Sequence, residues 1–373
     1  MKVCDYLQLA APGIQALQPY QPGKPIEELE RELGITDVIK LASNENPLGA
    51  SPRAVQALKG ALGELHRYPD GGAFELKRAL AAKLRVGMDT ITVGNGSNEV
   101  LELIARAYVQ PGAEVVFSQH AFAVYPLVTQ AVGGRAVVVP AAGYGHDLQA
   151  MQAAVTPRTR LVFIANPNNP TGTWSRREDV HRFLRGVPPE VIVVLDEAYF
   201  EFVTEPEYPD GVQWMRDFPN LVVTRTFSKI YGLAALRVGY GISNPEIADV
   251  LNRVRQPFNV NSLAMTAAVA ALQDEEHVRA SAELNRRGMR QLESAFRAAG
   301  LDYIPSVANF LSVEVGDAAR VYEALLRAGV IVRPIASYGM PRHLRVTVGL
   351  PAENERFLAA LAAALDAVGA GRR

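Results

Sequence analysis

The sequence has a single cysteine, Cys4, among 373 residues. One thiol cannot form a disulfide within the chain, and it cannot supply the cysteine cluster that a structural zinc or an iron–sulfur site needs. The six histidines show neither an HxH nor an HExxH spacing. The sequence therefore predicts no metal site and an inert thiol.

The chain also lacks a long apolar run and an excess of charge of one sign. Nowhere do 18 apolar residues follow one another, which argues against a transmembrane helix, and Asp5 lies where a signal peptide would begin. The 38 basic and 39 acidic residues leave a net charge of −1, so neither nucleic acid nor an anionic membrane is an expected partner. These features predict a cytoplasmic protein.

Short apolar runs alternate with amphipathic stretches in the middle of the chain. Several runs are apolar at every position, as in strands that are buried on both faces of a sheet. Helix-like segments separate the runs, which favours an α/β fold with a mostly parallel sheet covered by helices. The expected strands are 114–118, 136–140, 161–165, 191–195 and 221–224, and the expected helices are 98–109, 123–132 and 176–184.

The two ends of the chain have a different pattern. Residues 1–35 contain the stretch PYQPGKP and are expected to form an arm that packs on a small domain or on a partner subunit. Residues 36–255 would form the large domain, and residues 256–373 a smaller α+β domain. The elements expected in the smaller domain are helices at 263–296 and 318–328, strands at 310–315, 330–333 and 344–348, and a last helix with an apolar stripe.

Lys229 lies just after an apolar run, in the segment TRTFSKIYGLAALRVGY. A lysine that is removed from water has a lowered pKa and can attack a carbonyl to form a Schiff base. The flanking hydroxyls of Thr226 and Ser228, with Arg237 eight residues after the lysine, are suited to binding a phosphate. From this segment alone, a surface lysine in an ordinary turn is an equally good interpretation.

Asp196 ends the apolar run VIVVL, where an ionised carboxylate is costly unless it meets a cation. A protonated ring nitrogen is one such partner, bound by a charge-assisted hydrogen bond worth about 1.5–3 kcal/mol. Tyr199, three residues later, could reach the same ligand through its hydroxyl. Two alternatives stay open: an aspartate that caps a helix, and a Walker B carboxylate, for which the chain lacks the GxxxxGK(S/T) loop.

Two further polar segments carry candidate site residues. The segment ANPNNPTG (165–172) follows a strand and would project asparagine side chains into the crevice at the carboxyl ends of the strands. The segment GNGSNEVLELIA (94–105) is a glycine-rich turn that begins a helix. The free backbone N–H groups of Ser97, Asn98 and Glu99 would face a phosphate there. Taken alone, each segment is also consistent with a simple turn.

Together these segments contain a carbonyl-trapping lysine, a partner for a ring nitrogen, a phenol, an amide and a phosphate cup. That set matches the functional groups of pyridoxal 5′-phosphate (PLP). The motifs NPNNPTG, DEAY and SK with an arginine eight residues later resemble the signatures of the fold-type I PLP aminotransferases. The segments PYQPGKP, LASNENPLG, RYPDG and IVRPIASYGMPRHLRVTVG resemble the histidinol-phosphate aminotransferases within that family.

The resemblance covers essentially the whole chain and implies a role for each matching residue. Lys229 would bind the cofactor aldehyde and carry the proton at the substrate Cα, and Asp196 would keep the pyridine nitrogen protonated. Tyr199 and Asn169 would donate hydrogen bonds to the phenolic oxygen. Phe122 would stack on the ring, where many relatives have a tyrosine. The residues implied for the cofactor phosphate are Ser97, Asn98, Thr226, Ser228, Arg237 and, from a partner subunit, Tyr68.

Substrate recognition, by the same resemblance, would depend on two arginines near the C-terminus. Arg345 would bind the α-carboxylate of the amino donor, and Arg333 would help to bind the phosphate of histidinol phosphate, since a guanidinium binds such anions with two parallel hydrogen bonds. Tyr20 would contribute from the neighbouring subunit, and Asn44 is a further substrate-binding candidate. A surface ion pair is the alternative for each arginine.

The resemblance implies a homodimeric transaminase that exchanges an amino group between L-histidinol phosphate and 2-oxoglutarate, with imidazole acetol phosphate and L-glutamate as the other pair. An aromatic or broad-range aminotransferase and a threonine-phosphate decarboxylase would share the cofactor residues. A PLP-binding regulatory module without turnover is a third alternative. The presence of Lys229 and the lack of a DNA-binding region argue against it.

Overall fold

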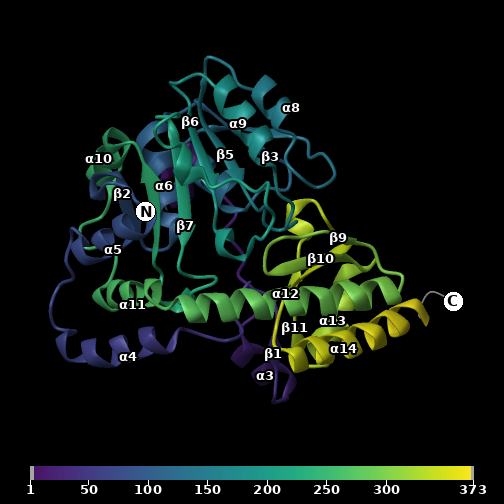
Figure 1. The fold of residues 1–373 in the computed structure, drawn as a ribbon. Helices are drawn as coiled ribbons and strands as arrows, with labels where there is room; N and C mark the ends of the chain where they lie inside the picture. Colours follow the sequence, from purple (N-terminus) through teal and green to yellow (C-terminus); the bar gives the residue numbers. More distant parts are fainter. Residues whose placement is uncertain (1–3, 371–373) are drawn as a thin grey trace.

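The computed structural model describes residues 4–370 of the chain. Figure 1 shows a larger body built around a twisted sheet with helices on both faces, and a smaller body formed by the C-terminal part. The long helix α12 (Glu275–Ala298) runs along both bodies. It contacts the 3-10 turn η3 (Phe200–Phe202) in the larger body and the helix α14 (Pro351–Ala370) in the smaller one. The predicted fold class is confirmed.

The central sheet has seven strands in the order β2-β8-β7-β6-β5-β3-β4. Strand β8 runs antiparallel to both of its neighbours, and the other strands are parallel to one another. The strands predicted in this region are all present. Their bounds are β2 Ile91–Gly94, β3 Glu114–Ser118, β4 Arg135–Val139, β5 Thr159–Ala165, β6 Ile192–Asp196, β7 Leu221–Thr226 and β8 Gly239–Ser243.

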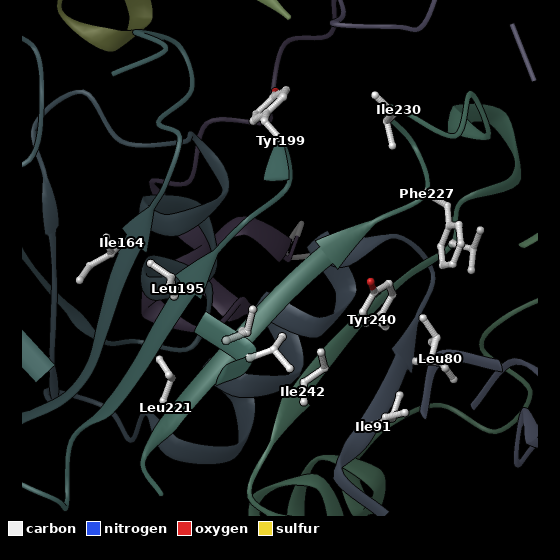
Figure 2. Close-up of a cluster of buried hydrophobic side chains, with 14 of the residues drawn as sticks. Leu80, Ile91, Ile164, Leu195, Tyr199, Leu221, Phe227, Ile230, Tyr240 and Ile242 are labelled. Atoms are coloured by element: carbon white, nitrogen blue, oxygen red, sulfur yellow. The ribbon is translucent and has the colours of Figure 1, made fainter. Parts of the chain in front are cut away.

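Two hydrophobic cores, one on each face, explain why the central strands are apolar at every position. Along β5, Val162 and Ile164 pack into one core, whereas Leu161 and Phe163 pack into the other. Figure 2 shows side chains of the first core, such as Ile164 and Leu195, projecting from the strands. The helices of that core include α5 (Phe74–Leu84), α8 (Leu148–Ala153), α9 (Arg177–Gly186) and α11 (Ser262–Leu272), and those of the second are α6 (Ser97–Tyr108), α7 (Val124–Ala131) and α10 (Pro245–Val254).

Strand β4 differs from the expectation of burial on both faces. It lies at the edge of the sheet and pairs only with β3. Val138 is accordingly 51% exposed, although the run around it is as apolar as those of the central strands. Composition alone does not separate an edge strand from a central one.

The single helix predicted at 263–296 is wrong, because the structure has two helices there, α11 (Ser262–Leu272) and α12. Asp274 lies between them, and its side chain accepts a hydrogen bond from the backbone N–H of His277 at 3.3 Å, which caps the new helix. Helix α11 packs on α4 (Pro52–Ala61) and α5 in the larger body. The domain bounds 36–255 and 256–373 stay a prediction.

The smaller body has an antiparallel sheet in the order β12-β13-β10-β9, covered by α12, α13 and α14. Phe357 and Leu361 of α14 are buried in its core, as the apolar stripe predicts. The remaining bounds are β9 Tyr303–Ile304, β10 Phe310–Glu314, β11 Val330–Ile331, β12 Arg333–Pro334, β13 His343–Thr347 and α13 Ala318–Arg327.

The N-terminal segment lies against both bodies of its own chain. Helix α2 (Pro12–Gln15) packs on α7, while Leu29 of α3 (Ile26–Leu33) packs on Leu326 and Ile331. Strand β1 (Ile39–Lys40) then pairs with β11 in a short parallel ladder. The arm therefore crosses the junction between the two bodies before the chain enters the larger one. A four-residue helix, α1 (Tyr6–Leu9), precedes these elements.

Candidate active site

A cavity of about 390 Å³ lies at the carboxyl ends of the parallel strands, where ligands bind in open α/β sheets. Asp196 and Thr226 reach it from the last positions of β6 and β7, and Arg345 from β13 of the smaller body. All predicted site residues line it except Tyr68. They are Tyr20, Asn44, Ser97, Asn98, Phe122, Asn169, Asp196, Tyr199, Thr226, Ser228, Lys229, Arg237, Arg333 and Arg345.

Lys229 presents its amine to this cavity. Its Nζ donates a hydrogen bond to the backbone oxygen of Ser43 at 3.1 Å and lies 5.8 Å from the centre of the Tyr199 ring. Burial and the positive charge of Arg345 lower the pKa of Lys229 to about 8. About a tenth of the amine is then neutral at pH 7, a far larger fraction than for an exposed lysine. This side chain can act as a nucleophile toward a carbonyl and as a proton carrier.

Asp196 is a buried carboxylate that lines the same cavity. Its Oδ2 accepts a hydrogen bond from the Tyr125 hydroxyl at 2.8 Å, and its Oδ1 accepts one from Thr224 Oγ1 at 3.0 Å. Burial raises the pKa of Asp196, and these two donors oppose that rise. A cation in the cavity, such as a protonated ring nitrogen, would complete the stabilisation of the ionised form.

Tyr125 and Thr224 are functional residues that the sequence patterns did not single out. Tyr125 lies on α7 and stacks in parallel on Phe163, with ring centres 4.4 Å apart and 3° between the planes. Thr224 is the register partner of Asp196 across the β6–β7 ladder. Side chains alternate between the two faces of a strand, so Thr224 faces the same side as Thr226, two residues later. This alternation is the one feature of the sequence that indicates a place for Thr224 near the site.

The hydroxyl of Tyr199 is oriented by Asn44, whose amide nitrogen donates to it at 2.8 Å. The same asparagine is bound to Thr347 of β13, because Thr347 Oγ1 donates to Asn44 Oδ1 at 3.1 Å. Burial raises the pKa of Tyr199 to about 12, so the phenol stays protonated and can donate a hydrogen bond. Asn44 thus lines the cavity, as expected, and also links Tyr199 to the smaller body.

The other end of the cavity has the properties of an anion site. Helix α6 begins at Ser97, and its N-cap residue, Gly96, provides no side chain to cap the first N–H groups. Arg237 Nη1 donates to Ser228 Oγ at 3.3 Å. A Cβ added to Gly96 would lie 2.4 Å from Arg237 Nη2, so glycine is needed for the guanidinium to lie against the turn. The helix dipole, the arginine and the hydroxyls together suit a phosphate dianion.

Arg345 and Arg333 are directly opposite each other in the antiparallel β12–β13 pair. Arg345 is 6% exposed and donates to Asn169 Oδ1 and to the backbone oxygen of Ala42. Its Nε has no hydrogen-bond partner among the residues that the structure describes. A buried guanidinium that lines the cavity is suited to a carboxylate or phosphate ligand.

Tyr20 was expected to act from a neighbouring subunit, but the structure places it in the cavity of its own chain. The Arg333 guanidinium lies 5.5 Å from the centre of the Tyr20 ring and donates to the backbone oxygen of Gln21 at 2.6 Å. These contacts hold the arm over the cavity of the same chain. The sequence indicates that the arm exists, but it does not indicate whether the arm packs on its own chain or on a partner subunit.

Tyr68 is the predicted site residue that does not reach the cavity of its own chain. It is 83% exposed and stacks on Phe258, with ring centres 4.9 Å apart. Its proposed contribution from a partner subunit stays a prediction.

The residues present fit PLP. The cavity offers an amine of lowered pKa, a buried carboxylate with two donors, a protonated phenol and a cradle for a phosphate. Among residues 4–370, no three His, Cys, Asp or Glu side chains come together as they would around a metal ion. No helix in the described part of the chain is long and apolar enough to span a membrane.

Comparison with known proteins identifies the family. Residues 36–361 match the family described as aminotransferase class I and II. The chain is 61% identical to histidinol-phosphate aminotransferase 2 of Pseudomonas fluorescens Pf-5, over 97% of this chain and 98% of that protein. It is 60% identical to the corresponding Pseudomonas aeruginosa PAO1 protein, over 96% and 98% of the two chains. The crystal structure of the histidinol-phosphate aminotransferase from Sinorhizobium meliloti, in complex with PLP, superposes with a TM-score of 0.88 at 32% identity, covering 96% of this chain and 97% of that one. The chain therefore belongs to the class I and II aminotransferases and, within them, to the histidinol-phosphate aminotransferase family.

Proposed function

We propose that this enzyme uses PLP to transfer an amino group between L-histidinol phosphate and 2-oxoglutarate, forming imidazole acetol phosphate and L-glutamate. The observation that carries the proposal is the single cavity in which Lys229, Asp196 and the phosphate cradle meet the two arginines of the smaller body. The names of the relatives at 60–61% identity support the substrate, and the PLP complex of the Sinorhizobium meliloti enzyme supports the cofactor.

Lys229 performs the proton transfers in this mechanism. Bound PLP supplies an electron sink that stabilises the carbanion formed at the substrate Cα and stores the amino group between the two half-reactions. Lys229 Nζ takes the proton from the substrate Cα as a base and gives the same proton up again as an acid, so each half-reaction balances in protons. With a pKa of about 8, the amine is close to the acidity that serves both a base and an acid near neutral pH.

The remaining cofactor residues orient the ring. Asp196 would accept a hydrogen bond from the protonated ring nitrogen and keep that nitrogen charged, while Tyr199 and Asn169 would donate to the phenolic oxygen. Phe122 would stack on the ring, since it lines the cavity next to Tyr125. The phosphate would be bound by five residues that line the same cavity: Ser97, Asn98, Thr226, Ser228 and Arg237.

The two arginines bind the anionic groups of the substrates. Arg345 binds the α-carboxylate of glutamate, since its guanidinium lines the cavity and can make a two-point contact with an anion. Arg333, less buried and next to Tyr20 and Gly23 at the cavity wall, binds the phosphate of histidinol phosphate. Tyr20 and Asn44 contact the substrate from the N-terminal side.

A homodimer and a cytoplasmic location belong to this proposal. Exposed apolar side chains support the homodimer. They include Leu62, Leu65 and Phe74, which are near Tyr68 in the sequence, and Phe258, which stacks on Tyr68. An apolar surface of this kind is typical of an interface. In the dimer, the partner's copy of Tyr68 would reach the cofactor phosphate.

The test is a single-turnover spectrum of the PLP-loaded enzyme mixed with L-histidinol phosphate and no keto acid. We expect loss of the lysine-bound cofactor absorbance, with pyridoxamine phosphate and imidazole acetol phosphate as products. A response to glutamate or phenylalanine but not to histidinol phosphate would instead indicate a general aminotransferase. Release of carbon dioxide from threonine phosphate would indicate a decarboxylase.

A further inference from the structure

A buried ion pair lies behind the active site and is not used by the chemistry described above. Arg225 in β7 has a side chain only 4% exposed, and the side chain of Glu197 is fully buried. Neither residue lines the cavity. Arg225 donates from Nε and Nη2 to Glu197 Oε2, at 2.9 and 2.6 Å, and from Nη2 to Asp210 Oδ1 at 2.7 Å.

The stability of the fold does not by itself explain this arrangement. Removing charged groups from water costs several kcal/mol for each ion, and replacing a buried ion pair with apolar residues of similar size is often neutral or stabilising. The site around Arg225 is already rich in apolar and aromatic side chains, with the guanidinium carbon 3.5 Å from the centre of the Phe200 ring. A purely structural contact could be made here without charge.

Two of the three partners of Arg225, Glu197 and Phe200, each adjoin a residue of the cavity, whereas Asp210 does not. Glu197 follows Asp196, and Phe200 follows Tyr199, while Arg225 itself lies between Thr224 and Thr226. The guanidinium therefore contacts the chain immediately next to the carboxylate, the phenol and the phosphate-binding hydroxyl.

Strand geometry places this pair on the face of the sheet away from Asp196. Asp196 and Thr224 are register partners, and their side chains are hydrogen-bonded on the cavity side. Successive side chains alternate between the faces of a strand, so Glu197 and Arg225 extend the same ladder on the other face. The backbone bond from Glu197 N to Thr224 O, at 2.9 Å, lies between the two side-chain pairs.

The network also fixes a loop. Glu197 Oε1 accepts a hydrogen bond from the backbone N–H of Gly211 at 2.8 Å, and Asp210 is bound by the same arginine. A Cβ on Gly211 would lie 2.8 Å from Leu195 and Val223 side-chain atoms, so the loop fits against the strands only with glycine at this position. Both oxygens of Glu197 are thereby engaged.

We propose that Arg225 is a positioning residue for the cofactor site. By binding Glu197 and Asp210 from the far face of the sheet, it holds the carboxyl ends of β6 and β7 at the separation that lets Asp196, Tyr199 and Thr226 contact one cofactor molecule. This inference rests on the proposed function, because it assigns the network to PLP binding.

The test uses the double variant Arg225→Met, Glu197→Gln, which removes both charges of the fully buried pair together, while Asp210, whose side chain is 33% exposed, keeps access to water. Glutamine keeps an acceptor for Gly211, so we expect a folded protein with a cooperative thermal transition. PLP affinity, measured by titrating the cofactor-free protein, should fall about tenfold or more, the lower end of what supporting contacts contribute around metal sites. The pH midpoint of the bound cofactor's absorbance should shift as well, whereas a merely structural pair would leave it unchanged.

Two further variants bracket the result. Arg225→Lys keeps the charge without the two-pronged contact and should give an intermediate affinity. Arg253→Met removes an exposed ion pair with Asp249 on α10 and should leave both readouts at the wild-type value. A double variant that binds PLP within twofold of wild type would overturn the inference. So would one that fails to fold, since the network would then serve the fold as a whole. If the wild-type protein itself binds no PLP, it is the proposed function that fails.

Discussion

Replacing Tyr125 with phenylalanine removes one hydroxyl from the buried carboxylate of Asp196 and leaves the aromatic ring in place. The ring is expected to keep its parallel stacking on Phe163. The carboxylate loses the donor to Oδ2 at 2.8 Å and keeps the Thr224 hydroxyl on Oδ1 and the backbone N–H of Ala198. The perturbation is therefore local and electrostatic.

The size of the effect follows from the hydrogen bond that is lost. A hydrogen bond to a charged group contributes about 1.5–3 kcal/mol, and about 1.4 kcal/mol corresponds to one pKa unit. Burial already raises the pKa of Asp196, and the substitution raises this pKa further because the Tyr125 hydroxyl opposes the effect of burial. In the cofactor-free protein, the free energy of unfolding falls by about the same 1.5–3 kcal/mol wherever Asp196 is ionised.

The pH dependence of this loss has a definite sign. A carboxyl with a raised folded-state pKa favours the folded protein below its unfolded pKa and loses that contribution as the pH rises through the folded pKa. The variant has the higher folded pKa, so its deficit is small in acid and grows with pH. The measurement is urea unfolding of the cofactor-free proteins at pH 5 and pH 8, with PLP affinity measured in parallel.

Tyr231→Phe is the matched control, because Tyr231 is a buried tyrosine that belongs to the core on the other face of the sheet. Its deficit should not depend on pH in this range. A Tyr125→Phe deficit that is absent, equal at both pH values, or matched by Tyr231→Phe would refute the reasoning about Asp196.

Three other predictions concern the amine, the substrate arginine and an ion pair at the sheet edge. In the cofactor-free enzyme, the reaction of Lys229 with a carbonyl reagent should increase with pH and level off above about 8, because burial lowers the pKa of the amine; Lys229→Ala should abolish this reaction and turnover. Arg345→Met should raise the KM for glutamate about 30-fold or more and raise the pKa of Lys229, since the arginine's charge lowers it; an unchanged KM would exclude the assigned role. Glu114, fully buried and bound to Arg135 and Arg158, has a pKa lowered to about 2. Stability at pH 7 should therefore fall by about 1.5–3 kcal/mol in Glu114→Gln, and the wild-type advantage should vanish as the pH drops from about 4.5 toward 2, as monitored by circular dichroism.

Much of the fold follows from the order of apolar runs along the chain. A strand that is buried on both faces must be apolar throughout, and parallel strands need helical connections, so the pattern predicts a covered parallel sheet. The same logic places Asp196, Asn169 and Lys229 after strand ends, because the carboxyl ends of parallel strands meet at one edge. Polar residues at these points are visible in the sequence.

The break between α11 and α12 and the exposure of β4 were not visible in this way. Periodicity reports which residues are apolar, whereas the cap at Asp274 and the edge position of Val138 depend on neighbours. The helical pattern of the sequence continues across residues 273–274. A single Asp among residues that are compatible with a helix therefore did not indicate that one helix ends and another begins there.

The sequence by itself determined which chemical groups this protein brings to its site: the amine of Lys229, the carboxylate of Asp196, the phosphate-binding turn and two arginines. Only the tertiary structure decided how they act. It buries Lys229 beside Arg345 and so lowers the amine's pKa, and it brings Tyr125 from α7 onto Asp196. It also folds Tyr20 back over its own cavity. The physical reason is that these effects depend on distance and burial between segments far apart in the chain, and residue order encodes neither directly.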